Sequence, residues 1–343
     1  MDRDFDELDN LFEHKNVAKL KAQLKKIIDD LTPSEKVAAA QAVDRKTRER
    51  LASLGYVSNV QVLQKKNFGI QDDIKTLLPF INRTDDAWEL YKDGKQETGI
   101  KLLKGILEER KDIDMAYKNL AAIYQEKGNT EEALAILEQG LSALPTSYEI
   151  IIEYMKGLIA TDQNDKVIST FENLRIREAE YDPEIWNNLG TAYANKGSFS
   201  EAIKAFEMGL SLDDKHPELY NNLANACYSY GLQSRDPLLF SRCFEYYKKA
   251  IEIDPGYSVP YFGLGHAYRQ RGDLGGAIHC WERALEADPD FGQARFDLAM
   301  AHLSTGNKVK ACELLNEYKK RYYYLMSPSE KERLDALLEK CQE

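Results

Sequence analysis

Residues 183–216, PEIWNNLGTAYANKGSFSEAIKAFEMGLSLDDKH, carry a pattern that much of the chain repeats. Apolar residues recur at helical spacing within each half of this stretch, which predicts two helices. Gly197 lies between the halves, where a chain leaving a helix needs the left-handed backbone conformation that glycine allows. Ser198 or Ser200 can begin the second helix by accepting a hydrogen bond from its free N–H groups. The stretch therefore predicts a helix, a turn and a second helix.

Residue size varies along this stretch as the packing of two helices requires. Small residues at Gly190, Ala202 and Gly209 let two backbones approach closely. Large residues fill the remaining space, namely Trp186, Leu189, Tyr193 and Phe206. One such hairpin cannot bury its own apolar face, so it needs a neighbour on each side.

The same spacing recurs before and after this stretch. The predicted copies span residues 80–113, 114–147, 148–182, 183–216, 217–257, 258–291 and 292–325. The third copy is degenerate and has Asp162 where the turn glycine belongs. The fifth has seven extra residues, which we place near Leu232–Leu238, in the turn or at the start of the second helix. Residues 327–343 open with a capping box, Ser327 to Glu330, and predict a helix that covers the last copy.

The pattern resembles the tetratricopeptide repeat (TPR) family. The matching residues in the central copy are Trp186, Leu189, Gly190, Tyr193, Ala202, Phe206 and Gly209. Asp214 stands where the family usually has proline. The resemblance implies an all-α, right-handed superhelical solenoid of about seven helix-turn-helix repeats over residues 80–326, followed by a capping helix over residues 327–343.

Residues 1–58 contain no repeat and resemble a second family. Residues 44–57, DRKTRERLASLGYV, are similar to the tail of bacterial sulfatase-like chains that are fused to TPR arrays. The nucleophile motif of that family, Cys or Ser followed by x-Pro-x-Arg, is absent from the sequence. We therefore interpret residues 1–58 as a helical N-terminal segment without catalytic residues, and residues 59–79 as a linker.

The net charge restricts the kind of partner that the chain can bind, and the cysteines indicate its compartment. The formal net charge of −11 argues against a nucleic-acid backbone or an anionic membrane as the main partner. No apolar run approaches the ~20 residues of a membrane-spanning helix, and the N-terminus, MDRDFDELDN, is unlike a signal peptide. The five cysteines form no CxxC pair, which is typical of reduced thiols in the cytoplasm. A fragment of a longer secreted chain would instead be extracytoplasmic.

The resemblance implies that the first helix of each repeat lines a concave groove. Asparagine recurs at the groove-facing positions, and an amide side chain can both donate to and accept from a peptide backbone. The candidate peptide-binding residues are Asn119, Asn187, Asn188, Asn221, Asn222, Asn225, Tyr228, Phe262, His266 and Arg269. Asparagine at these positions also simply tolerates solvent, and the row is interrupted by Glu153, Gly263 and Asp297.

The sequence predicts no catalytic residue, metal ligand or cofactor site. Histidines and cysteines lack metal-binding spacing, and no phosphate-binding loop is present. Tyr322, Tyr323 and Tyr324 end the last repeat, and they either pack against the capping helix or mediate self-association. We therefore expect a non-enzymatic protein-interaction scaffold that binds an extended peptide or a partner helix in the groove. The alternative is a detached accessory region of a sulfatase-like hydrolase whose catalytic part is absent from this chain.

Overall fold

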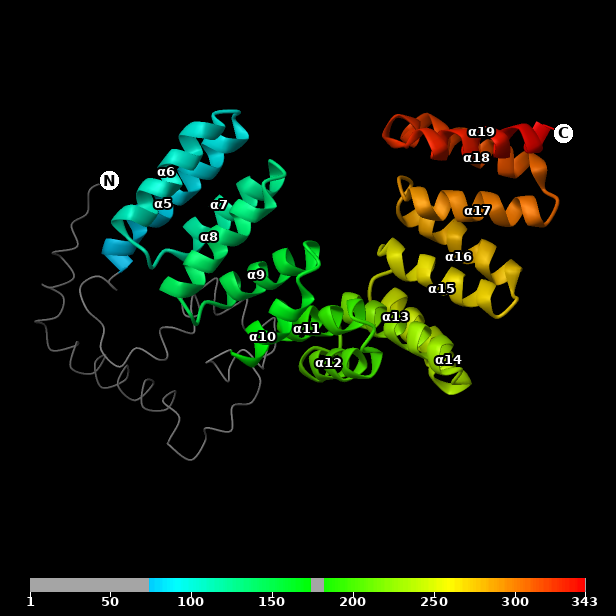
Figure 1. Cartoon of the computed structure of the whole chain (residues 1–343), viewed down its shortest axis with the longest axis horizontal. Coiled ribbons are helices and arrows are strands. Elements are labelled where there is room, and N and C mark those ends of the chain that lie inside the picture. The colour runs from blue at the N-terminus through cyan, green and yellow to red at the C-terminus, as the bar shows by residue number, and fades with distance from the viewer. Residues whose placement is uncertain (1–73, 174–181, 343) are drawn as a thin grey trace, which may run out of the picture. The chain divides into compact units, whose positions relative to one another are not determined.

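The computed structural model describes residues 74–173 and 182–342 of the chain (Figure 1). In these two ranges the regular structure is helical, with fifteen α-helices and no strand. Residues 1–58, with their resemblance to a sulfatase tail, lie outside the described residues, so that interpretation stays a prediction.

Fourteen of the helices form seven consecutive pairs. The pairs are α5 (Ile74–Lys92) with α6 (Gln96–Glu109), α7 (Asp114–Glu126) with α8 (Thr130–Ala143), α9 (Tyr148–Ala160) with α10 (Asn164–Glu172), α11 (Pro183–Asn195) with α12 (Phe199–Leu212), α13 (Pro217–Ser234) with α14 (Pro237–Ile253), α15 (Ser258–Gln270) with α16 (Leu274–Ala287), and α17 (Gly292–Ser304) with α18 (Lys308–Tyr322). A short 3-10 helix, Tyr323–Leu325, leads to the last helix, α19 (Pro328–Gln342). The repeat architecture predicted from the sequence is confirmed.

Every turn within a pair contains one residue in the left-handed region of backbone conformation. Five turns use glycine, namely Gly94, Gly128, Gly197, Gly272 and Gly306. The degenerate third repeat keeps this conformation with Asp162, whose φ is 56°. Its side chain supports the turn, because Oδ1 accepts a 2.6 Å hydrogen bond from Nδ2 of Asn164. The absence of glycine therefore leaves the hairpin of the third repeat intact.

The extra residues of the fifth repeat lengthen both of its helices. α13 has 18 residues and α14 has 17, whereas α11 has 13 and α12 has 14. The turn between them contains only Arg235 and Asp236, so the insertion does not enlarge it. Asp236 caps α14, since its Oδ1 accepts hydrogen bonds from the N–H groups of Leu238 and Leu239 at 2.8 and 3.3 Å. By contrast, Ser198 lies at the N-cap of α12 without a side-chain capping bond, which corrects its expected role.

The first helix begins earlier than the pattern suggested. α5 starts at Ile74 and continues through Pro79, within the segment predicted as a linker. The first four N–H groups of a helix have no partner within it, and Pro79 lies just beyond them. Pro79 therefore removes one hydrogen bond from the helix, and the helix continues through it near its N-terminal end.

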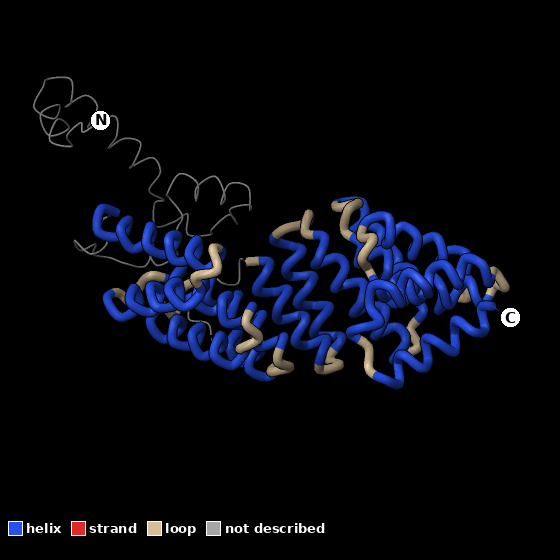
Figure 2. Tube along the Cα trace, turned by 90° about the horizontal axis from the view of Figure 1, so that it is seen from above, coloured by secondary structure: helices blue, strands red, loops and turns tan. Residues whose placement is uncertain are grey.

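Neighbouring repeats share clusters of buried apolar side chains. Figure 2 shows the helices and the short loops between them. One cluster of buried side chains extends from Tyr117 of the second repeat to Ala205 of the fourth, and another from Ala202 to Cys280 of the sixth. The first helices α5, α7, α9, α11, α13 and α15 also contact one another in succession, and no comparable contact joins successive second helices within the described ranges. We call the exposed side of α7, α9, α11, α13, α15 and α17 the first-helix surface.

The last helix covers the end of the seventh repeat. Leu334 and Leu338 of α19 are buried in the same cluster as Leu315 of α18. The predicted capping box is present, because Ser327 N–H donates to Oε2 of Glu330 at 2.8 Å and Glu330 N–H donates to Oγ of Ser327 at 3.4 Å.

Two of the three terminal tyrosines form hydrogen bonds within the chain. The hydroxyl of Tyr322 donates to the carbonyl oxygen of Asp290 at 2.6 Å, and that of Tyr323 donates to Oδ2 of Asp335 on α19 at 3.0 Å. Tyr324 is 76% exposed. Tyr322 and Tyr323 thus contribute to packing within the chain, and self-association through these tyrosines stays a prediction.

Candidate functional site

All ten candidate peptide-binding residues lie on first helices, but the structure divides them. Asn119 lies on α7 and is half-buried. Asn187 and Asn188 lie on α11, and Asn221, Asn222, Asn225 and Tyr228 on α13. Phe262, His266 and Arg269 lie on α15. Two groups result, one at the junction of α11 with α13 and one at the junction of α15 with α17, and Asn119, Asn225 and Tyr228 belong to neither.

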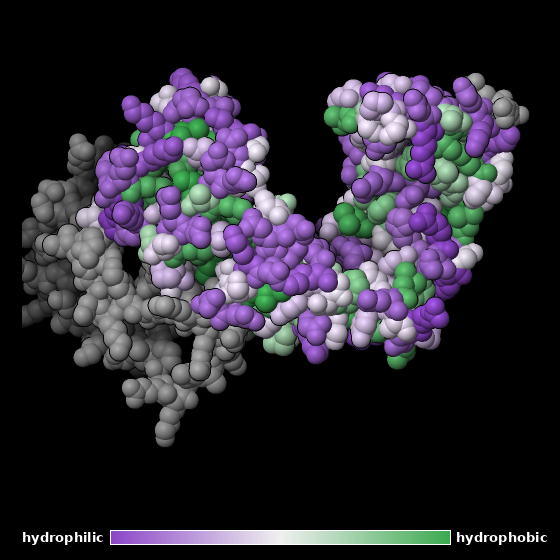
Figure 3. Space-filling model, viewed as in Figure 1, coloured by the Kyte–Doolittle hydropathy of each residue, from purple (hydrophilic) through white to green (hydrophobic). Residues whose placement is uncertain are grey.

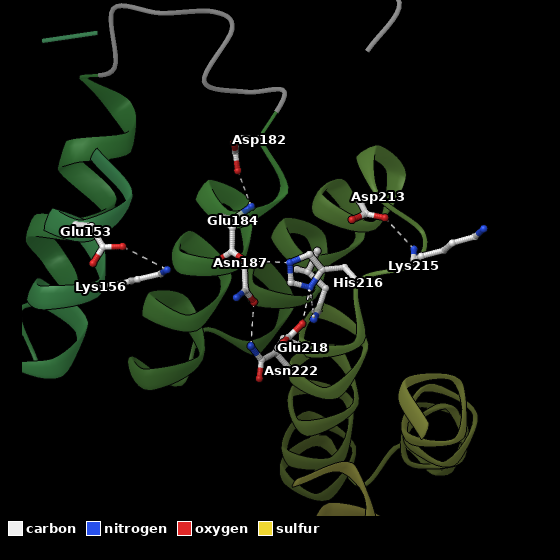
Figure 4. Close-up of polar contacts among 11 residues, drawn as sticks. Glu153, Lys156, Asp182, Glu184, Asn187, Asp213, Lys215, His216, Glu218 and Asn222 are labelled. Carbon is white, nitrogen blue, oxygen red and sulfur yellow. Dashed lines mark hydrogen bonds and ion pairs between the residues drawn. The ribbon is translucent and has the colours of Figure 1, made fainter. Parts of the chain in front are cut away.

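Three asparagines at the first junction are joined by hydrogen bonds. Nδ2 of Asn222 donates to Oδ1 of Asn187 on the preceding repeat at 2.9 Å (Figure 4). Nδ2 of Asn221 donates to Oδ1 of Asn222 at 3.2 Å. We call Asn187, Asn222 and Asn221 the amide chain. It crosses from one repeat to the next, because Asn187 lies on α11 and Asn222 on α13.

The predicted asparagine row is only partly exposed. Asn188 is 5% exposed and Asn221 is 3% exposed, whereas their neighbours Asn187 and Asn222 are half-buried. Consecutive helical residues point about 100° apart, and here one asparagine of each adjacent pair points toward the surface and the other toward the interior. Within the described part of the chain, Nδ2 of Asn188 and Oδ1 of Asn221 have no hydrogen-bond partner. Asn188 and Asn221 therefore do not line the surface, which corrects the prediction for these two residues.

A buried histidine lies beside the amide chain. His216 precedes α13 and is 3% exposed. Its Nε2 lies 3.0 Å from Oε1 of Glu184 on α11, and its Nδ1 lies 3.1 Å from Oε2 of Glu218 on α13 (Figure 4). The N–H of Leu219 also approaches Nδ1, at 3.4 Å, and caps the helix when that nitrogen is unprotonated. His216 thus connects the first turns of two successive first helices.

The environment of His216 favours its charged form. Burial alone would lower the pKa of the imidazole, but the hydrogen bond and charge of Glu184, together with the charges of Glu218 and Asp213, raise it above its usual value. Sequence reasoning gave His216 no role. The sequence feature that could have pointed to this site is the glutamate at the second position of three successive repeats. These glutamates are Glu149, Glu184 and Glu218.

The second group of candidates forms ion pairs with a residue of the seventh repeat. Nε2 of His266 lies 3.1 Å from Oδ2 of Asp297 on α17, and Arg269 lies 3.6 Å from the other oxygen of the same carboxylate. Phe262 packs edge-to-face against His266, with ring centroids 4.5 Å apart. Asp297, which interrupts the asparagine row in the sequence, therefore neutralises the positive charge that was expected to serve a ligand.

The remaining candidates on α13, Asn225 and Tyr228, both contact α14. The hydroxyl of Tyr247 on α14 donates to Oδ1 of Asn225 at 2.5 Å. Tyr228 packs against Phe240, with ring centroids 5.8 Å apart. Both residues contact α14, but Asn225 is exposed and stays a surface candidate. The α11–α13 junction differs in having a hydrogen bond between asparagines of two successive repeats.

The chemistry available in the described residues is that of hydrogen bonds and charge. Burial raises the pKa of Cys227 to about 11 and that of Cys243 to about 12, so these thiols stay protonated and are poor nucleophiles. No group of three or more histidine, cysteine or acidic side chains there is arranged to hold a metal ion. No described helix is long and apolar enough to cross a membrane. On the face shown in Figure 3, hydrophobic residues form small patches among hydrophilic ones.

Tandem helical hairpins that share one interior define a helical-repeat protein. Two models of the tetratricopeptide repeat match this chain, one over residues 86–228 and the other over residues 262–322. The chain therefore contains tetratricopeptide repeats, and the resemblance inferred from residues 183–216 is confirmed.

The chain spans less than a third of the length of the first two proteins described next. The match to human protein O-mannosyl-transferase TMTC1 has 26% identity and covers 48% of this chain and 18% of that protein. The peroxisomal targeting signal receptor of Candida albicans is 27% identical over 52% of this chain, which spans 31% of the receptor. A tetratricopeptide repeat protein from Parabacteroides merdae has a TM-score of 0.57 and 16% identity, and the match covers 77% of this chain and 99% of that one. This structure shows the fold alone.

Proposed function

We propose that this chain is a non-enzymatic protein-interaction scaffold that binds an extended peptide or a partner helix on its first-helix surface, centred on the α11–α13 junction. The repeats support this proposal, as does the similarity to a receptor that is named for targeting signals. The observation that carries it is the hydrogen bond between Asn187 and Asn222 across two repeats.

The amide chain keeps hydrogen-bonding capacity for a ligand. The Oδ1 atom of Asn187 accepts from Asn222, and its Nδ2 makes no hydrogen bond within the described residues. Oδ1 of Asn222 accepts one bond, and an amide oxygen can accept two. The amide nitrogen of Asn187 and the amide oxygen of Asn222 therefore lie on one surface. They can bond to the carbonyl oxygen and the N–H group of a bound peptide.

Selection from a library of randomised linear peptides tests this function. The purified chain should enrich peptides that bind it, and the Asn187→Ala, Asn222→Ala double variant should bind them roughly thirtyfold more weakly, since two lost hydrogen bonds of about 1 kcal/mol each amount to about 2 kcal/mol. Gln139→Ala is the matched control, because it removes an exposed amide from the second helix α8. Failure of the wild-type chain to enrich any peptide, or equal affinities of wild type and double variant, would contradict the proposal.

A further inference from the structure

We propose that Cys312 and Cys341 form a redox-sensitive pair, which a peroxide converts to a disulfide that fixes the capping helix α19 to α18. The pair lies outside the first-helix surface, because α18 is the second helix of the seventh repeat and α19 follows it. This modification site is therefore separate from the proposed peptide-binding surface.

The register of α18 and α19 places the two cysteines opposite each other. The helices pack together at the C-terminal end of the array (Figure 1). They run antiparallel, since only a short connection joins them. Nζ of Lys319 on α18 lies 2.7 Å from Oδ1 of Asp335 on α19. Cys312 is seven residues before Lys319 and Cys341 is six residues after Asp335, so both lie about two turns from this ion pair, away from the connection.

Both cysteines face the interface between the two helices. Cys341 is 7% exposed and belongs to one buried cluster with Leu315 and Leu338. Cys312 packs against the same cluster. On α18, Cys312 is three residues from Leu315, and on α19, Cys341 is three residues from Leu338. Each cysteine therefore shares a helix face with a buried leucine of the interface.

The packing of two helices leaves a distance that a disulfide can span. Packed helix axes lie about 8–10 Å apart and Cα atoms lie about 2.3 Å from each axis, so facing Cα atoms are roughly 4–6 Å apart. A disulfide joins Cα atoms about 4.4–6.8 Å apart. The two thiols also interact directly: burial, and after it the hydrogen bond with the thiol of Cys312, raise the pKa of Cys341. The disulfide is therefore compatible with the packing of the reduced chain.

The two thiols differ in their access to an oxidant. Cys312 is half-buried, whereas Cys341 is buried and its raised pKa keeps it protonated. The other three cysteines, Cys227, Cys243 and Cys280, are at most 5% exposed. A peroxide in solvent therefore meets Cys312 first.

The oxidation proceeds in two steps and consumes one molecule of hydrogen peroxide. The sulfur of Cys312 attacks one peroxide oxygen, the O–O bond breaks, and a sulfenic acid and one water form. The sulfur of Cys341 then attacks the sulfenic sulfur, the S–O bond breaks, the S–S bond forms, and a second water leaves. Each thiol proton leaves in one of the two waters. Both sulfurs are thereby oxidised, and the peroxide is reduced to water.

Mass spectrometry of the full chain tests the pair. The reduced chain is treated with hydrogen peroxide, its remaining thiols are blocked, and it is cleaved with trypsin in the absence of reductant. Cleavage after Lys310 and Lys340 places Cys312 and Cys341 on different peptides. These two peptides should appear joined, with the loss of two hydrogen atoms, and dithiothreitol should separate them.

Hydrogen exchange measures the effect on the capping helix. Oxidation of the wild-type chain should slow exchange in α19 by at least about tenfold, because the bond keeps α19 from separating from α18. Dithiothreitol should restore the original rate. Cys341→Ala should abolish both the joined peptides and the slowing. Cys280→Ala is the matched control, since it removes a buried thiol from α16 and should preserve both.

Four results would overturn the inference. The first is the survival of all thiols, and the second is an oxygenated Cys312 without joined peptides. The third is a disulfide that joins two other cysteines or two chains. The fourth is a bond between Cys312 and Cys341 that leaves exchange in α19 unchanged. None of these results bears on peptide binding at the first-helix surface.

Discussion

Gly190 on α11 lies against the ring of Phe206 on α12, so closely that a Cβ atom at Gly190 would be 2.5 Å from Cε1 of Phe206. Phe206 is 1% exposed, and its ring has no open space into which it can move. The small residue Gly190 of the first helix and the large residue Phe206 of the second helix thus pack directly against each other within the hairpin.

Gly190→Ala should destabilise the fourth repeat because the added methyl group meets the ring of Phe206. Overpacking of this kind costs about 1–3 kcal/mol, which exceeds the gain of about 1 kcal/mol from the better helix propensity of alanine. Gly105→Ala is the control, because a Cβ there meets nothing within 4 Å and the propensity gain should remain. Urea unfolding should show opposite signs for the two variants, and equal effects would contradict the packing argument.

Arg235→Gly should stabilise the fifth repeat. Arg235 has a φ of 56°, and a left-handed conformation costs a residue with a Cβ about 1–2 kcal/mol. Glycine avoids that cost but loses about 0.5–1 kcal/mol of chain entropy, so the net gain should be up to about 1 kcal/mol. Arg235→Val should destabilise instead, since a branched Cβ fits this conformation worst. A thermal unfolding midpoint that falls in the glycine variant would contradict this account.

The sequence predicted the repeats well because their rules are local. Gly197 was expected in the left-handed conformation and adopts it, with a φ of 76°. The lengthened helices of the fifth repeat were less predictable, although Asp236 followed by Pro237 is a favourable helix start. The same residues are also compatible with a longer loop between the two helices. The packing of α13 against α14 favours the longer helices instead.

The candidate site was predictable only in outline. The sequence places Asn187 next to Asn188 and Asn221 next to Asn222, but it does not say which member of each pair faces the surface. That choice depends on the rotation of each helix against its neighbours, and it differs between α11 and α13. The role of His216 depends on contacts with Glu184, 32 residues earlier, which no local pattern reveals.

The stability of the array should depend on the protonation of His216. Its pKa is raised in the folded chain by Glu184 on α11, Glu218 on α13 and Asp213, despite the opposing effect of burial. The proton therefore stabilises the folded state fully below the unfolded pKa, and this stabilisation is lost as the pH rises through the folded pKa.

His216→Gln provides the test, because it removes the titrating group. Urea unfolding between about pH 5.5 and about pH 8.5 should show that the stability advantage of wild type over the variant shrinks as the pH rises. His302→Gln is the contrasting control: burial lowers the pKa of His302, so its contribution changes with pH in the opposite direction. A wild-type advantage that grows with pH would contradict the assignment for His216.

Leu334→Ala should unfold the C-terminal end of the array while leaving its other repeats folded. Leu334 is 2% exposed and packs in the cluster that joins α18 to α19, so its truncation should cost about 2–5 kcal/mol. Each repeat is stabilised mainly by its neighbours, so the loss should be concentrated in α17, α18 and α19. Hydrogen exchange should show lower protection of those helices and unchanged protection of α7 and α8. Glu332→Ala, an exposed change on the same helix, should have no such effect. Equal loss of protection along the whole array would show instead that it unfolds as one cooperative unit.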